Sequence, residues 1–220
     1  MSSLLRLHGT PLSNYYNKVK IALLEQGRAF EEVHALPADL WPQAGSPTGK
    51  IPWLQTPDGH CLHESAAIIE YLEETRGDAP SLFPVHPVDR ARCRELVQYL
   101  ELYIELPVRD LYGAAFWGAT LETGQADRAI QQAEKGLKFL ARRASFDPWL
   151  CGDTFSQADA TAWAHLTTVQ RALHFVGAGD LMATALPTLP AYLEKLAARP
   201  SIAHVINDIR LELRRQSGKS

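Results

Sequence analysis

Long apolar runs are missing from this 220-residue sequence. A membrane-spanning helix needs about 18 or more consecutive apolar residues, and no stretch reaches that length. The segment Met1–His8 also lacks the basic and then apolar pattern of a secretory signal. The three cysteines, Cys61, Cys93 and Cys151, lie far apart and form no Cys-X-X-Cys pair, which is typical of a reducing compartment. We therefore expect a cytoplasmic protein that does not span a membrane.

An excess of charge of either sign is also missing. The sequence has 22 Lys and Arg against 25 Asp and Glu, which gives a net charge of −3. Nucleic acids and anionic membranes attract strongly basic surfaces. The sequence therefore favours neither nucleic acid nor a membrane as a partner.

Motifs for metals, nucleotides and serine hydrolysis are missing as well. The eight histidines form no His-Glu-X-X-His motif, and the nearest grouping is His60 and His63 on a predicted hairpin, so we expect no metal. The segment Gly45–Ile51 resembles a phosphate-binding loop, but its glycines are too close and Ile51 replaces the required Ser or Thr. No Gly-X-Ser-X-Gly elbow of a hydrolase occurs.

The first part of the chain mixes strand and helix patterns. The segment Pro37–Gly49 is rich in Pro and Gly and predicts a loop with one helical turn. The turn residues Pro57–His60 join two short strands into a hairpin. The resulting order, βαβαββα, predicts a mixed sheet with one right-handed crossover. The predicted strands are Leu4–Leu7, Phe30–Leu36, Ile51–Thr56 and Cys61–His63, and the predicted helices are Asn17–Gln26 and Ser65–Gly77.

A proline-rich connection divides the chain. Pro80, Pro84 and Pro87 predict a linker at residues 79–87, between a domain at 1–78 and an all-helical domain at 88–215. In the second domain, helices are predicted at 88–115 with a kink at Pro107, and at 126–144, 156–173, 191–198 and 201–215. Ser156 and Asp159 have the spacing of a helix-capping pair.

Three segments at strand ends of the first domain carry polar residues. The segment His8–Val19 passes from strand to helix, so its hydroxyls and amides lie where a helix offers unpaired N–H groups to an anion. Glu64-Ser65 is a second such junction, suited to the ammonium and carboxylate of an amino acid. At Lys50–Pro52, a proline enters a strand without a ladder donor of its own. Ordinary helix capping explains the two helix starts as well.

Together these segments resemble the glutathione S-transferase superfamily. The similar segments are Gly9–Leu23, Pro47–Leu54, Leu62–Ile68 and Ser156–Asp159, in the same order as in the family and across almost the whole chain. The resemblance is to serine-type members, the bacterial tau-, zeta- and theta-like proteins. It implies a thioredoxin-like domain followed by a helical domain, a homodimer, glutathione as co-substrate and a role in detoxification.

The resemblance also implies roles for single residues. Ser13 falls on the hydroxyl that activates the glutathione sulfur. Asn14 stands where many serine-type members have proline, and tyrosine activates the sulfur in other classes. Asn14, Tyr15 and Tyr16 therefore remain alternatives to Ser13.

The resemblance places the rest of glutathione on two further segments. Lys50 falls on a contact to the glycyl end, and Ile51 pairs through its backbone with the cysteinyl part, before Pro52, which is cis in the family. Glu64 and Ser65 bind the γ-glutamyl end. Ser156 and Asp159 resemble the family's folding cap and carry no chemistry.

The implied reaction is attack of a bound thiolate on a small hydrophobic electrophile. The resemblance places the electrophile between the domains, with candidate aromatic contacts at Tyr103, Tyr112, Phe116 and Trp117, which core packing explains equally well. Two alternatives stay open: a glutathione-dependent disulfide or peroxide reductase, and a non-catalytic binding protein. The absence of the Ser-Ser-Cys signature makes maleylacetoacetate isomerisation a weaker expectation. The lack of cysteine in Gly9–Val19 likewise makes reductase chemistry that uses a protein thiol a weaker expectation.

Overall fold

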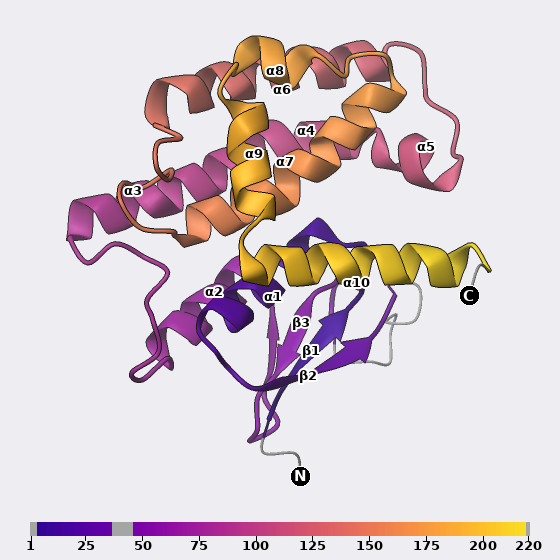
Figure 1. The fold of residues 1–220 in the computed structure, drawn as a ribbon. Helices are drawn as coiled ribbons and strands as arrows, with labels where there is room; N and C mark the ends of the chain where they lie inside the picture. The colour runs from indigo at the N-terminus through magenta and orange to yellow at the C-terminus, as the bar shows by residue number, and fades with distance from the viewer. Residues whose placement is uncertain (1–3, 37–45, 219–220) are drawn as a thin grey trace. The chain divides into compact units, whose positions relative to one another are not determined.

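The computed structural model describes residues 4–36 and 46–218, and its contacts divide the chain into two units. One unit contains Met1–Leu82 together with Arg199–Ser220, and the other contains Phe83–Ala198. Figure 1 shows the sheet in the first unit and helices throughout the second.

Four strands form the sheet of the first unit, in the order β2-β1-β3-β4. β1 (Leu5–Gly9) runs parallel to β2 (Phe30–His34), whereas β3 (Trp53–Gln55) is antiparallel to both β1 and β4 (Cys61–His63). This confirms the predicted mixed sheet. The predicted loop and helical turn at Pro37–Gly49 fall mostly outside the described residues.

Two helices of the first unit follow strand ends. α1 (Asn14–Glu25) connects the parallel strands, and α2 (Ser65–Glu74) follows the hairpin and contacts both β3 and β4. Apolar side chains on one face of the sheet, among them Leu7 and Leu54, are fully buried. Their burial fixes the register, because a shift by one residue would turn them to the other face.

The second unit is helical in all its regular elements among the described residues. Helix α3 (Pro87–Gln98) continues into a π-helical segment, η2 (Tyr99–Glu105), and then into the short α4 (Leu106–Arg109). The predicted break at Pro107 therefore takes the form of a wider helical turn directly before the proline, which has no backbone N–H to donate. The remaining helices are α5 (Tyr112–Trp117), α6 (Gln125–Arg143), α7 (Gln157–Phe175), α8 (Leu181–Ala185) and α9 (Leu189–Ala197).

The last helix, α10 (Pro200–Gln216), groups with the first unit. The sequence places residues 201–215 in the helical domain, so this grouping differs from the predicted boundaries. The physical reason lies in ion pairs with α1. Arg199 contacts the Glu25 carboxylate at 2.6 Å, and Asp208 contacts the Lys20 ammonium at 2.6 Å. The first unit is therefore discontinuous in sequence.

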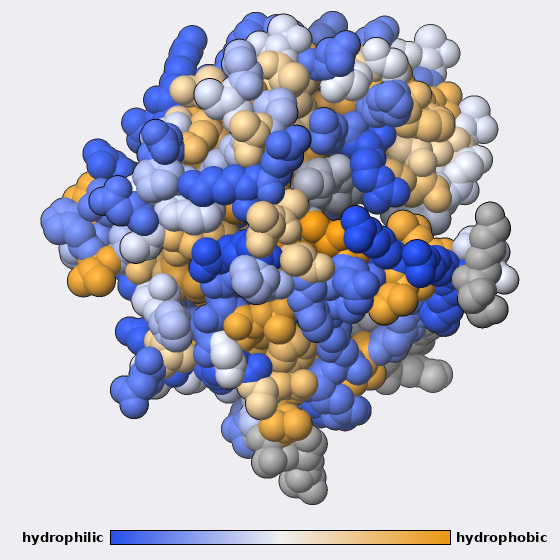
Figure 2. Space-filling view, viewed as in Figure 1, coloured by the Kyte–Doolittle hydropathy of each residue, from blue (hydrophilic) through white to orange (hydrophobic). Residues whose placement is uncertain are grey.

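Hydrophilic and hydrophobic side chains both reach the surface. On the face in Figure 2, hydrophilic and hydrophobic residues are interspersed. None of the helices within residues 4–36 and 46–218 has the length and apolarity needed to span a bilayer.

Candidate functional site

The sheet register brings the three predicted junctions to one edge of the sheet. His8 of β1 lies opposite Trp53 of β3, and Trp53 lies opposite His63 of β4. Because β1 and β4 run antiparallel to β3, the chain leaves β1 and β4, and enters β3, at the same edge. The segments after Gly9, before Trp53 and after His63 therefore start from neighbouring positions, and α1 and α2 begin close to this edge.

The start of α1 is held by its own turn. Ser13 is the N-cap residue, and its Oγ accepts a hydrogen bond of 3.3 Å from the Tyr16 backbone N–H. The Ser13 N–H donates to the Thr10 carbonyl at 3.0 Å, and the Asn17 amide donates to the Pro11 carbonyl at 2.9 Å. The first turn of α1 contains no acidic residue, so no carboxylate there offsets the positive end of the helix dipole. Since Oγ accepts in this contact, its own hydrogen can donate to a sulfur.

The three alternatives to Ser13 lie in different surroundings. Asn14 is buried, and its Oδ1 accepts from the Tyr15 N–H at 3.0 Å. Tyr15 is half-buried, with the Lys18 ammonium 5.5 Å from its ring centre. The Tyr16 hydroxyl is buried and donates to Glu32 at 2.5 Å. Burial, and then the bond to Glu32, raise the pKa of Tyr16, so this tyrosine keeps its proton.

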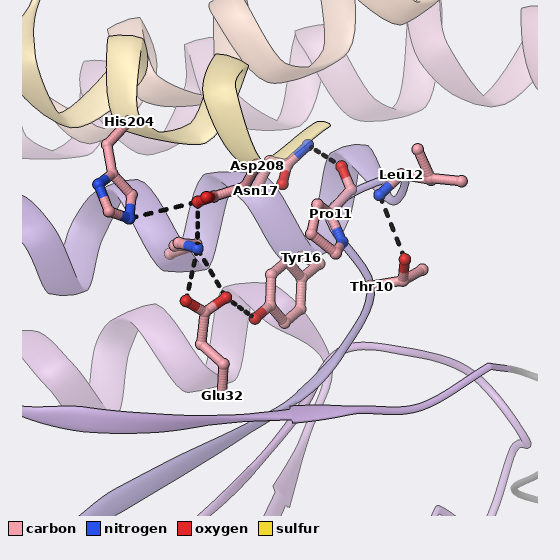
Figure 3. A network of polar contacts seen from close by, with 9 residues as sticks. Thr10, Pro11, Leu12, Tyr16, Asn17, Glu32, His204 and Asp208 are labelled. Carbon is pink, nitrogen blue, oxygen red and sulfur yellow. Dashed lines mark hydrogen bonds and ion pairs between the residues drawn. The ribbon is translucent and has the colours of Figure 1, made fainter. Parts of the chain in front are cut away.

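A polar network fastens Tyr16 and α1 to β2 and α10 (Figure 3). The Lys20 ammonium lies 2.6 Å from oxygens of both Glu32 and Asp208, and the Lys20 side chain is 1% exposed. His204 lies 3.2 Å from Asp208 on the next turn of α10. The ring of Tyr16 covers Gly9, where any Cβ would collide with it. The network thus fixes the helix that Ser13 caps.

The same network contains the potential metal ligands found among the described residues. Glu32, His204 and Asp208 bring ligand atoms within 4.8 Å of one another. The Lys20 ammonium already contacts both carboxylates. A protein cation therefore already offsets part of the charge that a metal ion would balance.

The segment before β3 lies at the same edge. The carbonyl of Lys50 accepts from the Ser46 hydroxyl at 2.9 Å, while the Lys50 side chain is exposed. The Ile51–Pro52 peptide bond is cis. Ladder pairing of β3 starts at Trp53, so the backbone of Ile51 lies outside the ladder.

The junction after β4 has an unusual backbone. Glu64 has φ 66° and ψ 116°, a region that a non-glycine residue rarely adopts and that costs about 1–3 kcal/mol. Glu64 is the exposed N-cap residue of α2, and its side chain makes no capping hydrogen bond. Ser65, at the first helical position, is buried. The first N–H groups of α2 therefore receive no capping hydrogen bond from the Glu64 side chain.

Sequence reasoning missed two buried features beside these segments. The rings of His8 and Trp53 stack at 3.5 Å, and burial lowers the pKa of His8 to about 4. The network around Lys20 was missed too, because Asp208 is 188 residues away. The signal available in the sequence was Lys20 itself, a charged residue between the apolar residues Val19 and Ile21.

The four candidate aromatic residues fall into two groups in the second unit. Tyr112, Phe116 and Trp117 form one group, with ring centres 5.3 and 5.8 Å apart along the series. Tyr103 instead contacts Tyr99 and Phe139, at 5.7 and 6.1 Å. Trp117 is 72% exposed, whereas Tyr112 is buried.

Ser156 and Asp159 form the capping box of α7. The Asp159 carboxylate accepts from the Ser156 N–H and hydroxyl, both at 2.7 Å, and from the Leu150 N–H at 2.8 Å. The Tyr192 hydroxyl donates to the same carboxylate. Both side chains are buried, and their hydrogen bonds fasten the start of α7 to the preceding turn and to α9.

Known proteins are similar to this chain in sequence and in fold. Residues 7–80 match the family model described as "Glutathione S-transferase, N-terminal domain", and residues 123–195 match "Glutathione S-transferase, C-terminal domain". A glutathione S-transferase of Pseudomonas putida is 36% identical over 207 residues, which cover 93% of this chain and 92% of that protein. The chain belongs to the glutathione S-transferase family.

Other members of the family differ in what they do. A crystal structure of a glutathione S-transferase from Methylobacterium radiotolerans, in complex with glutathione sulfonate, has a TM-score of 0.72 and 30% identity, and the match covers 91% of this chain and 93% of that one. A maleylacetoacetate isomerase of Rhizobium meliloti is 40% identical over 119 residues, 50% of this chain and 53% of that protein. Family membership confirms the prediction of an enzyme of the glutathione S-transferase type.

Proposed function

We propose that this glutathione S-transferase holds the glutathione sulfur as a thiolate beside Ser13 and directs it at a small hydrophobic electrophile. The observation that carries the proposal is the sheet register, which gathers Ser13, Ile51 and Glu64-Ser65 at one edge of the sheet. In this proposal the Ser13 hydroxyl donates to the sulfur and is not itself a nucleophile. The cytoplasmic location and the detoxifying role remain predictions from the sequence.

The required stabilisation is within the range of these groups. A free cysteine thiol has a pKa of about 8.5, and lowering it by roughly 2 units takes about 2.7 kcal/mol. One hydrogen bond to a charged group contributes about 1.5–3 kcal/mol. A helix N-terminus contributes about 0.3–1 kcal/mol. Ser13 and the start of α1 together supply enough.

The ends of glutathione define its direction in the site. We assign the γ-glutamyl carboxylate to Ser65 and the start of α2, and the neighbouring ammonium to the exposed Glu64 carboxylate. The cysteinyl backbone pairs with Ile51, and Lys50 contacts the glycyl carboxylate. The unusual φ of Glu64 supports this assignment, since strained backbone is often kept where a ligand is bound.

The aromatic group in the second unit suits an apolar electrophile. Phe116 and the exposed Trp117 offer ring surface, and we propose that they contact the electrophile. Trp117→Ala should raise KM for an aromatic electrophile and leave glutathione affinity unchanged. Val85→Ala, at an exposed apolar residue of the second unit, is the control.

A group of exposed apolar residues in the second unit, separate from Phe116 and Trp117, supports a homodimer. Leu102, Tyr103, Leu106 and Phe139 are each 46–49% exposed on η2, α4 and α6, and such clusters mark interfaces. Leu106→Glu should give a monomer by light scattering, whereas Leu211→Glu on α10 should not. A wild-type protein that is monomeric at assay concentrations would contradict the dimer.

The central test compares Ser13→Ala with Ser13→Thr, which keeps both the hydroxyl and a capping side chain. Ser13→Ala should lower kcat roughly 10- to 100-fold, because it removes about 1.5–3 kcal/mol from the thiolate state. Calorimetric affinity for glutathione should change little, and the pKa of the bound thiol should return towards that of the free thiol. Ser145→Ala, at an exposed serine of the second unit, controls for general effects.

The reaction class is decided by a panel of substrates. An aromatic halide, a hydroperoxide, a mixed disulfide and a cis-diketo acid distinguish the transferase, the reductase and the isomerase. Unchanged kcat and thiol pKa in Ser13→Ala would move the role to Asn14 or Tyr15. No measurable binding of glutathione would leave the non-catalytic interpretation.

A further inference from the structure

A pocket of about 590 Å³ opens in the second unit, where α5 packs against α7 (Figure 1). Its walls come from the end of α5, the last turns of α7 and the turn before α8. All of the lining residues belong to the second unit. The volume lies within the range of about 300–1,000 Å³ that is usual for sites that bind small molecules.

The turn between α7 and α8 is fixed by backbone hydrogen bonds. The Gly177 N–H donates to the His174 carbonyl at 3.1 Å, and the Ala178 N–H donates to the Leu173 carbonyl at 2.9 Å. Gly177 has φ 79°, the left-handed backbone that closes many helix ends in this way. The turn brings Gly179 against the ring of His174, where an added Cβ would lie 2.8 Å from Nδ1. This wall of the pocket is therefore part of the fold.

Two aromatic side chains provide apolar surface in the pocket. Phe116 lies on α5, and Phe175 is the last residue of α7. Phe175 is 54% exposed, so its ring keeps apolar area that a ligand can cover. Aromatic rings pair favourably when their centres lie about 4.5–7 Å apart. The pocket therefore suits a ligand with an aromatic ring.

A cation lies beside these rings. The guanidinium carbon of Arg171 is 5.0 Å from the ring centre of Phe116, a distance at which the ring attracts the cation and holds it. Arg171 is exposed, and no carboxylate within residues 4–36 and 46–218 forms an ion pair with it. Its planar guanidinium offers paired N–H donors that match the two oxygens of a carboxylate. The pocket thus combines aromatic surface with a side chain that binds anions.

The charges around the pocket favour a ligand with one negative charge. Asp180 also lines the pocket, and its exposed side chain makes no capping hydrogen bond to α8. This carboxylate would repel a second negative charge, so a phosphate dianion fits less well than a monocarboxylate. A cationic ligand fits poorly too, because Arg171 already occupies the position over Phe116 that such a ligand would use.

We propose that this pocket binds an aromatic carboxylate, with its ring against Phe116 and Phe175 and its carboxylate on Arg171, and that the electrophile of the glutathione reaction is a compound of this class. The binding site stands on the pocket alone, whereas its part in the reaction rests on the proposed function. In that reaction the glutathione thiolate forms a C–S bond with a ring carbon of the ligand, and a halide leaves with the electron pair of the broken bond. Arg171 selects the substrate by its charge and takes no part in making the bond.

The binding test uses naphthoate, which has no leaving group, in titration calorimetry on the intact protein. Arg171→Gln should weaken naphthoate binding roughly 5- to 20-fold, because it removes a charge-assisted hydrogen bond at an exposed site. Naphthamide, the neutral counterpart, should bind equally well to wild type and to Arg171→Gln. The control Arg142→Gln, at an exposed arginine of α6 outside the pocket, should bind naphthoate as wild type does.

Two results of the binding test would overturn the site. One is an equal effect of Arg171→Gln on naphthoate and naphthamide, or no effect on either. The other comes from Asp180→Asn, which removes the neighbouring negative charge and should strengthen naphthoate binding at low ionic strength. Weaker binding in this variant would mean that the carboxylate of Asp180 attracts the ligand, and the ligand would then not be a simple anion.

A matched pair of electrophiles tests the part of the pocket in the reaction. A chloronitrobenzoate and the corresponding chloronitrobenzamide both lose chloride to a thiolate but differ in charge. Arg171→Gln should lower kcat/KM for the benzoate by a factor similar to that for naphthoate binding, and should leave kcat/KM for the benzamide unchanged. Equal effects on the two electrophiles would overturn the substrate class. If wild type converts neither compound while naphthoate binding depends on Arg171, the proposed function fails and the binding site stands.

Discussion

Replacing Lys20 by methionine tests the network that holds α1. The ammonium of this fully buried side chain contacts Glu32 and Asp208 at 2.6 Å, and the two carboxylate side chains are 40% and 20% exposed. Methionine fills the same volume but leaves the carboxylates facing one another without a cation. Breaking a buried ion pair costs about 3–5 kcal/mol. Since water reaches both acids, we expect a loss of about 2–4 kcal/mol here.

The assay is urea unfolding followed by circular dichroism, with the free energy extrapolated to zero urea. Lys138→Met is the matched control, because Lys138 is exposed on α6 and pairs with Glu134 at 2.5 Å. The control should unfold close to wild type. Asp208→Asn added to Lys20→Met should recover part of the loss, because it removes the facing charge. A Lys20→Met midpoint equal to that of the control would refute the reasoning.

Three further outcomes follow from buried groups. Burial lowers the pKa of His8 to about 4, so the unfolded chain takes up a proton first as the pH falls. The free energy of unfolding should therefore drop by about 3 kcal/mol between about pH 6.5 and 4. This drop should be absent in His8→Phe and should persist in the control variant His60→Gln, at an exposed histidine. Asp159→Asn turns an amide towards donors that include Ser156, and calorimetry should show about 2–4 kcal/mol lost. Glu25→Ala removes the carboxylate that accepts hydrogen bonds from Arg199 and so links α1 to α10. Backbone amide hydrogen exchange in α10 should become faster, and an unchanged exchange rate would show that this ion pair does not hold α10.

Local patterns in the sequence predict much of the first unit. The apolar strand pattern at Leu4–Leu7 and the turn chemistry at Pro57–His60 reflect interactions between close neighbours in the chain. These interactions are visible in the sequence because the residues that make them are adjacent. The same holds for the Ser156 and Asp159 cap, whose partners are three residues apart.

Pairings between distant residues could not be predicted in this way. Lys20 meets Asp208 only because α10 returns to the sheet unit, and the Leu150 N–H meets the Asp159 carboxylate only because a turn packs against the start of α7. Periodicity states which face of a helix is buried and leaves open what covers it. The π-helical turn before Pro107 was hidden for a related reason, since a proline marks a break without specifying how the preceding turn adapts.

The grouping of α10 with the strands at the start of the chain has a consequence for biosynthesis. A ribosome synthesises the helix with Asp208 long after the four strands of the sheet. Until then the lysine of the first helix has only one of its two carboxylates. The network that holds the first helix is therefore complete only once α10 has been synthesised.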